Sequence, residues 1–443
     1  MKFALQRRPL GSGRKAVAFV SWSCLLHTTT LAMTVVPKNV VVVGGGVQGT
    51  SVAYQLALRT PASTTITILE SQQPASAASG KGGGFMARSW GDGSPTQGLH
   101  ELAFDMYSDL AQTLGCESYR KLPVLSVSPG YNGMKAARKN KDLAKIIPGW
   151  LDGTVGRVGS MGGGEDTAQI TPQEFVEKML EHQSRIQVVL GTCWGVETDQ
   201  GSERGSRKVA TVEYNPKENP AEKKLLPADT IIVSAGPWSC AAEDWFHGAV
   251  QLPMEGIKST SIVWKKPEGN DVDATALFCG EDDRFGTHLE VYPRPDGTIY
   301  ICGIGGSDYV SKEDLKEGAF REICEANELR VAAAKASFQE MSSVYKTSGE
   351  LDRSQACMRP CPPDAMPYMG SVPGYEGAYI NAGHNCWGIA WAPACGKAMA
   401  ELILDGESRC VNLTPFDPAR YTPDAQRGTR GRKQRGNNVG EQW

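Results

Sequence analysis

The glycines at positions 44, 46 and 49 have the spacing of a phosphate-binding turn. They form the pattern Gly44-x-Gly46-x-x-Gly49. The first glycine allows a tight turn, the second lets the backbone approach a pyrophosphate, and the third lets a helix pack closely on a strand. Glu70 follows 21 residues after Gly49, where a carboxylate can accept hydrogen bonds from both hydroxyls of a ribose. These residue types and spacings predict a dinucleotide-binding site.

The segments around these glycines predict a β-α-β unit. Residues 40–43 are four valines, which indicates a buried parallel strand. Residues 47–59 follow as a helix, whose free N-terminal amides would face the phosphates and bring Val47 and Gln48 beside them. Residues 65–69 form a second strand that ends at Glu70. A glycine motif alone is weak evidence, so the prediction depends on this context.

A second glycine-rich segment, residues 75–85, distinguishes between dinucleotides. It contains Ser79-Gly80-Lys81-Gly82-Gly83-Gly84. A nicotinamide-dependent enzyme needs no such loop here, whereas FAD requires the chain to pass flat against its ribityl chain and its ring. The alternative is a flexible surface loop. We therefore predict FAD as the cofactor, and the residues expected beside it in this loop are Ser79, Gly80, Lys81, Gly82 and Gly83.

Five segments of the chain resemble, in order, the D-amino-acid oxidase superfamily of FAD-dependent oxidoreductases, which includes glycine oxidase and sarcosine oxidase. They are residues 40–70, 76–84, 229–238, 358–370 and 383–406. The resemblance extends over about residues 38–410. The run from Gly82 to Ala87, followed by Trp90, is most similar to a eukaryotic oxidoreductase subgroup.

The resemblance implies an α/β fold in which two domains interleave along the chain. One is a Rossmann-like FAD-binding domain of the glutathione-reductase-like FAD/NAD(P)-binding type, and the other is a substrate domain built on an antiparallel sheet. The FAD-binding domain is expected to comprise residues 37–115, 166–245 and 357–410, and the substrate domain residues 116–165 and 246–356.

The sequence of the second domain is typical of antiparallel strands. Residues 259–264, 289–294 and 298–302 alternate in hydrophobicity, and Pro295-Asp296-Gly297 forms a turn between the last two. Residues 312–341 are expected to be largely helical. In the FAD-binding domain, a strand is expected over residues 229–234, and a helix capped by Thr171 is expected to run through Leu180.

The resemblance also implies further flavin contacts. The strand at 229–234 brings Ala235, Gly236 and Trp238 to the cofactor, and the backbone near Cys193 meets the adenine. A loop at 383–389, followed by a helix over 392–404, places backbone donors beside the pyrimidine end of the ring, where they stabilise negative charge. The contacts expected in this loop are Gly383, His384, Trp387, Gly388 and Ile389. His384 is interpreted as shaping the loop, and proton transfer by it is the alternative.

Arg359 is the expected substrate anchor. In glycine oxidase and its relatives the equivalent arginine pairs with the substrate carboxylate, which suits a planar guanidinium. An ordinary surface ion pair is the alternative. The chain departs from glycine oxidase at two positions, with Cys386 in place of a second arginine and Glu290 in place of a substrate-side tyrosine. Glycine is therefore not expected as the substrate, and Glu290 would pair with a cationic amine if it points inward.

The function that the resemblance implies is oxidation of the CH–N bond of a small amine or amino acid, with hydride transfer to flavin N5. Oxygen or another acceptor would reoxidise the flavin, as in an oxidase or a dehydrogenase. The alternatives are a flavin-binding regulatory protein without amine turnover and a 2-hydroxy-acid oxidoreductase. Cys357 precedes Asp364 by seven residues, the spacing of the flavin-linked cysteine in monomeric sarcosine oxidase. Arg359-Pro360 instead follows the non-covalent pattern, which we expect here.

The charge of the chain is unevenly distributed. Residues 1–39 carry six Lys or Arg and no acid, residues 425–443 have a net charge of +4, and residues 40–424 have −13, against −3 for the whole chain. An acidic body argues against a nucleic-acid-binding protein. Twelve cysteines without zinc-type spacing suggest reduced thiols and no metal site.

The two ends of the chain are expected to lie outside the catalytic fold. Residues 1–36 are rich in Arg, Ser and Thr, which is typical of an organellar transit peptide for a mitochondrion or plastid. A secretory signal or a cytoplasmic protein with a disordered extension is the alternative. The apolar stretch at 16–33 is too short and polar for a stable membrane span. The basic tail at 411–443 is expected to be disordered.

Overall fold

The computed structural model describes residues 36–423 of the chain. The predicted leader at 1–36, apart from Val36, and the basic residues from Asp424 onward lie outside the described part. Within residues 36–423, the longest apolar helices fall short of what is needed to cross a membrane.

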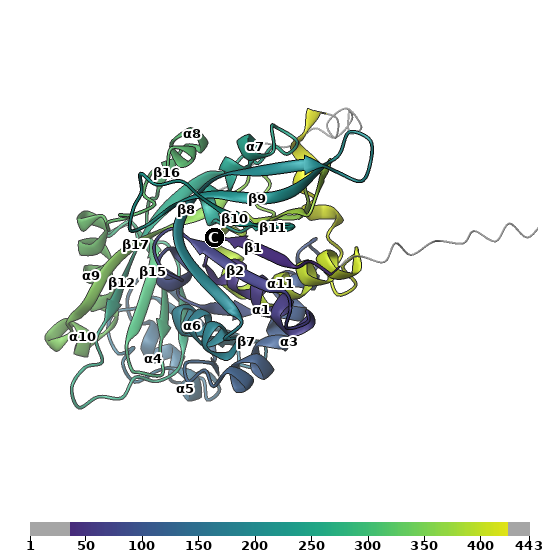
Figure 1. The fold of residues 1–443 in the computed structure, drawn as a ribbon. Coiled ribbons are helices and arrows are strands. Elements are labelled where there is room, and N and C mark those ends of the chain that lie inside the picture. The colour runs from purple at the N-terminus through teal and green to yellow at the C-terminus, as the bar shows by residue number, and fades with distance from the viewer. Residues whose placement is uncertain (1–35, 424–443) are drawn as a thin grey trace, which may run out of the picture. The chain divides into compact units, whose positions relative to one another are not determined.

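The first sheet has nine strands and carries the predicted β-α-β unit (Figure 1). β1 (Asn39–Val43) is followed by α1 (Val47–Arg59) and β2 (Thr65–Glu70). The remaining strands of the sheet are β8 (Ile186–Gln200), β9 (Arg207–Pro216), β10 (Lys224–Pro227), β11 (Thr230–Val233), β18 (Tyr368–Ser371), β19 (Tyr375–Glu376) and β20 (Ala378–Ala382). Parallel pairing joins β8, β2, β1, β11 and β20 in that order. The predicted Rossmann-like fold is confirmed.

The valines of β1 alternate between two hydrophobic cores. Val40 and Val42 pack into the core that α1 shares with α3 (Gln97–Leu114), α6 (Pro172–His182) and α11 (Gly388–Asp405). Val41 and Val43 pack on the other face, beside η1 (Gly236–Ala241) and α7 (Ala242–Trp245). Since both faces are covered, a continuous run of apolar residues suits the strand.

The second sheet has eight strands and forms the other wall of the site. Its strands are β5 (Val124–Ser128), β6 (Arg157–Gly162), β12 (Glu255–Trp264), β13 (Ala276–Cys279), β14 (Thr287–Pro293), β15 (Ile299–Ile304), β16 (Asp308–Val310) and β17 (Leu351–Cys361). β17 pairs along β12 in antiparallel register, so the expected boundary at residue 357 falls inside a strand of this sheet. The pairing is antiparallel except between β5 and β13.

One face of the second sheet is buried under two helices, α9 (Glu328–Met341) and α10 (Ser343–Ser348). Trp264 contacts the rings of Phe338 and Tyr345 at centroid distances of 5.8 and 5.4 Å. The opposite face is therefore free to line a site. The remaining short elements are α2 (Ala78–Lys81), β3 (Phe85–Ala87), β4 (Arg120–Lys121), α4 (Gly133–Ala137), α5 (Leu143–Ile146), β7 (Thr167–Gln169), α8 (Lys312–Lys316), η2 (Asn385–Trp387), η3 (Thr414–Phe416) and η4 (Pro418–Tyr421).

Several sequence predictions of local structure need correction. The helix expected over 312–341 is interrupted at 317–327, because Gly318 has a φ of +90° and Phe320 a φ of +56°. The helix expected to begin at residue 392 begins at Gly388. Thr171 occupies the N-cap position of α6, but its side chain makes no capping hydrogen bond.

The prediction that the chain is disordered from residue 411 onward is also wrong for residues 411–423. Phe416 is fully buried in η3. Arg420 in η4 forms an ion pair with Asp364, with Nε 2.8 Å from Oδ2. A buried aromatic side chain and a paired guanidinium hold this segment against the fold, which its composition did not reveal.

Gly44 provides a test of the turn between β1 and α1. Its φ is +107°, and a Cβ added there would lie 2.4 Å from the carbonyl oxygen of Ser234. We predict that Gly44→Ala lowers the free energy of unfolding by at least about 2 kcal/mol, measured by chemical denaturation. Gly93→Ala is the matched control, since Gly93 has a φ of +75° and open space around its Cβ position. An equal loss in both variants would show that the close approach to Ser234 is unimportant.

Candidate active site

A cavity of about 580 Å³ lies between the two sheets, within the usual range for a small-molecule site. Gly44, Leu69 and Ser234 line it from the carboxyl ends of β1, β2 and β11. Ligands of open parallel sheets bind at this edge. Tyr292 and Arg359 line it from the second sheet, so that two parts of the chain far apart in sequence enclose one space.

Backbone amides of the glycine turn hold the side chains expected at the dinucleotide. Gly45 N donates to Glu70 Oε2 at 2.7 Å, and Gln72 N donates to Glu70 Oε1 at 2.9 Å. Val47 N donates to the hydroxyl of Ser79 at 2.8 Å. The carboxylate therefore stands at the end of β2 in a defined orientation, and Ser79 meets the N-terminus of α1.

The structure brings most of the predicted site residues to this one cavity. Those that line it are Gly44, Gly46, Val47, Gln48, Glu70, Ser79, Gly82, Gly83, Cys193, Ala235, Gly236, Trp238, Glu290, Arg359, Gly383, His384, Trp387, Gly388 and Ile389. Their segments include both ends of the described chain, which only the fold brings together.

Three predicted residues lie outside the cavity wall. A Cβ at Gly49 would lie 2.0 Å from the carbonyl oxygen of Gly44, so this glycine serves the packing of the turn. Gly80 is similarly close to the carbonyl oxygen of Ala75, at 2.0 Å. Lys81 Nζ donates to the carbonyl of Ala356 at 3.0 Å and borders a smaller neighbouring cavity.

The glycines of the second loop let it pass between the second sheet and α11. A Cβ at Gly83 would lie 2.5 Å from the ring of Tyr292, and one at Gly82 would lie 2.6 Å from Ile389. A side chain at either position would collide with these neighbours. The loop can therefore lie flat there because it lacks side chains.

Buried polar atoms on the cavity wall fit a polar ligand such as FAD. Ser234 Oγ and Asn381 Oδ1 are buried and meet no partner among the described residues. Asn381 Nδ2 donates to Gln48 Oε1 at 3.2 Å, and Gln48 Nε2 donates to the carbonyl of Gly388 at 2.6 Å. This chain of bonds ties the start of α1 to the start of α11. Because α11 begins at Gly388, its free amides face the cavity.

His384 lies at the entry to η2, and its side chain is only 2% exposed. Its Nε2 meets no hydrogen-bond partner within residues 36–423. Burial lowers the pKa of His384 to about 3. The ring is therefore neutral at neutral pH.

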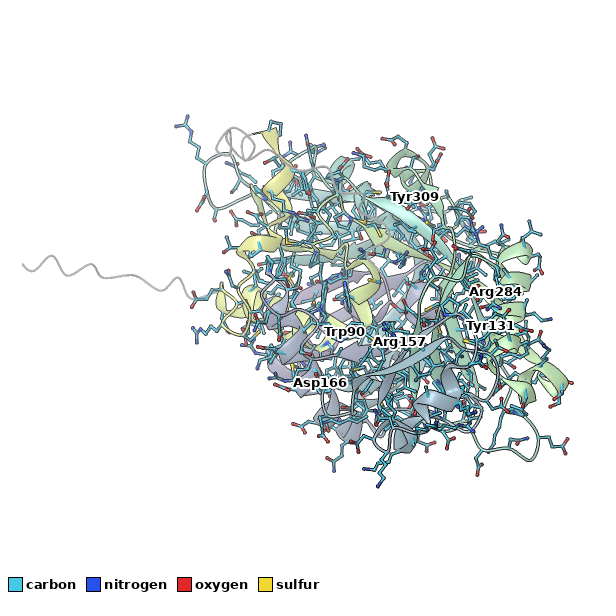
Figure 2. All side chains as sticks on the ribbon, turned by 180° about the vertical axis from the view of Figure 1, so that it is seen from behind. Trp90, Tyr131, Arg157, Asp166, Arg284 and Tyr309 are labelled. Atoms are coloured by element: carbon cyan, nitrogen blue, oxygen red, sulfur yellow. The ribbon has the colours of Figure 1, made fainter. Side chains whose placement is uncertain are left out.

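Aromatic rings from several elements wall the substrate side of the cavity. Phe85 stacks on Tyr292 with centroids 5.3 Å apart, and Trp90, labelled in Figure 2, contacts Phe85 and Phe278 at 5.4 and 5.0 Å. Arg359 enters this space from β17. It has no acidic partner within ion-pair distance in the part of the chain that the structure describes.

Sequence reasoning missed the cavity residues Phe278, Tyr292, Tyr300 and Cys302. A usable signal was present, because residues two apart on a strand share a face. Glu290 and Tyr292 are two apart on β14, and Tyr300 and Cys302 are two apart on β15. Ser234, directly after β11, was also missed, because burial of a polar atom depends on the assembled fold.

His384 should make stability depend on pH. Its pKa is about 3 in the folded chain, against 6.5 ordinarily, so below about pH 6.5 the unfolded chain binds a proton that the folded chain rejects. The stabilisation by the neutral ring is complete above pH 6.5 and is lost as the pH falls toward 3. We predict that the stability advantage of wild type over His384→Asn narrows by about 2 kcal/mol from pH 7 to pH 5, measured by urea denaturation.

His247→Asn is the matched control for this experiment, because His247 is exposed. Its difference from wild type should stay constant over the same pH range. A difference for His384→Asn that does not change with pH would contradict a neutral, buried ring.

Comparison with known proteins agrees with the prediction that this cavity binds FAD. A family model described as FAD dependent oxidoreductase matches residues 39–402. A Schizosaccharomyces pombe protein named as an oxidoreductase is 28% identical over 86% of this chain and 98% of its own length. Glycine oxidase of Pseudomonas aeruginosa is 24% identical over 86% of this chain and 99% of its own.

A solved structure shows the same fold. L-amino acid deaminase from Proteus myxofaciens superposes with a TM-score of 0.66 at 18% identity, covering 86% of this chain and 93% of the other. The resemblance expected from the sequence is thereby confirmed. With its glycine turn at the cavity and a family match over residues 39–402, the chain belongs to the DAO family of FAD-dependent oxidoreductases.

Proposed function

We propose that the chain oxidises the CH–N bond of a small amine or amino acid. The observation that carries the proposal is Arg359, a cation that faces an aromatic-walled cavity and has no acidic partner among residues 36–423. A carboxylate is the natural ligand for an unpaired planar guanidinium. The names of the relatives, glycine oxidase and L-amino acid deaminase, point to substrates of this class.

The residues of the chain would act mainly by positioning. When bound, FAD supplies the acceptor for a hydride from the carbon that bears the nitrogen. Arg359 would hold the carboxylate with two parallel hydrogen bonds. The rings of Phe85, Tyr292 and Trp90 would exclude water from the reacting carbon. The amides at the start of α11 would stabilise negative charge that develops near Gly388.

Replacing Arg359 tests the anchor. We predict that Arg359→Ala lowers kcat/KM for carboxylate substrates about 10- to 100-fold, mainly through KM, because one or two charge-assisted hydrogen bonds are lost. The measurement is the rate of anaerobic flavin bleaching across a panel of D- and L-amino acids, amines without a carboxylate, and 2-hydroxy acids.

Arg359→Lys is the matched control, since it keeps the charge and loses the planar fork. It should lie between wild type and Arg359→Ala, and all three should hold the same amount of flavin. An unchanged KM of Arg359→Ala for every carboxylate substrate would contradict the role of Arg359 in binding the carboxylate. Bleaching by hydroxy acids alone would replace the proposed function with CH–OH oxidation, and no bleaching by any compound would favour a regulatory flavoprotein.

We also propose that the flavin is held without a covalent bond to Cys357. Burial raises the pKa of Cys357 to about 11, so the thiolate that such a bond requires is scarce at neutral pH. The positive charge of Arg359 lowers the pKa of Cys357, but burial raises that pKa by more.

Acid precipitation distinguishes the two modes of binding. We predict a colourless protein pellet and a yellow supernatant, because a non-covalent flavin leaves the unfolded chain. A yellow pellet that becomes colourless in Cys357→Ser would establish the covalent link instead.

A further inference from the structure

Strand register places Glu290 on the cavity side of the second sheet. Glu290 pairs with Phe278 on one side and with Cys302 on the other. Paired residues of an antiparallel sheet point to the same face, and Phe278 and Cys302 both line the cavity. Its neighbours Leu289 and Val291 are fully buried on the opposite face. The carboxylate therefore points inward.

Two donors hold this carboxylate by one oxygen. The hydroxyl of Tyr292 and the thiol of Cys302 both donate to Oε2, the thiol at 3.4 Å. Within residues 36–423, Oε1 receives no hydrogen bond, and no Lys, Arg or His nitrogen lies within 4.0 Å of the carboxylate. A carboxylate on an aromatic cavity wall is costly to leave without a cation.

The rings around Glu290 also favour a cation. Phe278 and Tyr292 have their centroids 5.8 Å apart, and Tyr292 and Tyr300 stack at 6.1 Å. An ammonium group near aromatic faces is attracted by their negative electrostatic potential. The carboxylate and the rings together form a site suited to a positively charged group.

Glu290 and Arg359 border the same cavity from strands that are well separated. β12 and β15 lie between β14, which carries Glu290, and β17, which carries Arg359. At about 4.8 Å per strand, the two backbones are about 14 Å apart. The two side chains form no ion pair with each other. The nitrogen that is oxidised must be neutral when the hydride leaves its carbon, so a carboxylate suits a second cationic group better than the reacting amine.

We propose that Glu290 selects substrates with a second cationic group, namely amino acids whose side chain is positively charged. This inference rests on the proposed amine oxidation. The carboxylate of such a substrate would bind Arg359, and its side-chain cation would bind Oε1 of Glu290 among the rings of Phe278 and Tyr292. Glu290 is then a specificity residue, and a substrate as small as glycine would leave its carboxylate without a cation.

The experiment compares lysine with norleucine, which has the same carbon chain and no side-chain amine. Both enantiomers of each are mixed anaerobically with the flavin-loaded full chain, and kcat/KM is obtained from flavin reduction. We expect wild type to prefer lysine by about 10- to 100-fold, as for one charge-assisted contact. Glu290→Gln keeps an oxygen for Tyr292 and Cys302 and removes the charge, and its lysine-to-norleucine ratio should fall to about one.

Asp283→Asn is the matched control. Asp283 is an exposed acid on the connection between β13 and β14, and it lies outside the cavity. It precedes Arg284, which is labelled in Figure 2. Its ratio should equal that of wild type. Flavin content and the absorbance spectrum report whether each variant is folded, and Glu290→Asp, which keeps the charge, should retain part of the preference if Glu290→Gln does not fold.

The outcomes separate this inference from the proposed function. Reduction by norleucine as fast as by lysine in wild type, or an unchanged ratio in Glu290→Gln, overturns the inference and leaves amine oxidation standing. If Glu290→Gln is unfolded, a lysine-to-norleucine ratio in Glu290→Asp equal to that of wild type overturns the inference. No reduction by lysine, norleucine or any other amine overturns the proposed function, and the inference with it.

Discussion

The close contact between the Gly44 turn and the end of β11 determines where the site can lie. A Cβ at Gly44 would sit 2.4 Å from the carbonyl oxygen of Ser234, and one at Gly49 would sit 2.0 Å from that of Gly44. Three backbone segments therefore meet without side chains between them. The contact leaves the amides at the start of α1 and the carboxylate of Glu70 facing one space, which is the property that a dinucleotide site requires.

The rest of the site is assembled around that space by segments from the other end of the chain. Gln48 bonds to Gly388 and Asn381, so the start of α1 is joined to the start of α11. Gly82 and Gly83 pass between α11 and the second sheet because they carry no side chains. The strands of the two sheets alternate along the chain, so each wall of the cavity is built from segments far apart in the sequence.

The chemistry of the cavity is set by two charges that have no oppositely charged partner within ion-pair distance among residues 36–423. Arg359 and Glu290 approach from strands separated by two others, and aromatic rings fill the wall between and around them. In a polar surface such charges would be screened by water, whereas on an apolar wall they favour ligands of opposite charge. His384 contributes no charge at neutral pH, because burial lowers its pKa to about 3.

The sequence alone determined the local parts of this protein. The valines at 40–43, the glycine spacing and Glu70 predicted the β-α-β unit, because strand and turn preferences act between near neighbours. The family resemblance also directed attention to Arg359 and Glu290, and both line the cavity. Sequence reasoning missed the break at 317–327 and the order at 411–423, where Gly318 and Phe416 depend on tertiary surroundings.

Only the tertiary structure decided which way the side chains point and which of them meet. The inward direction of Glu290 follows from its pairing with Cys302 on another strand, and a shift of register by one residue would have reversed it. Gly49, Gly80 and Lys81 belong to the predicted motifs but lie outside the cavity wall. Burial, pairing and the separation of charges depend on contacts between different strands and helices, and local sequence preferences carry no information about those contacts.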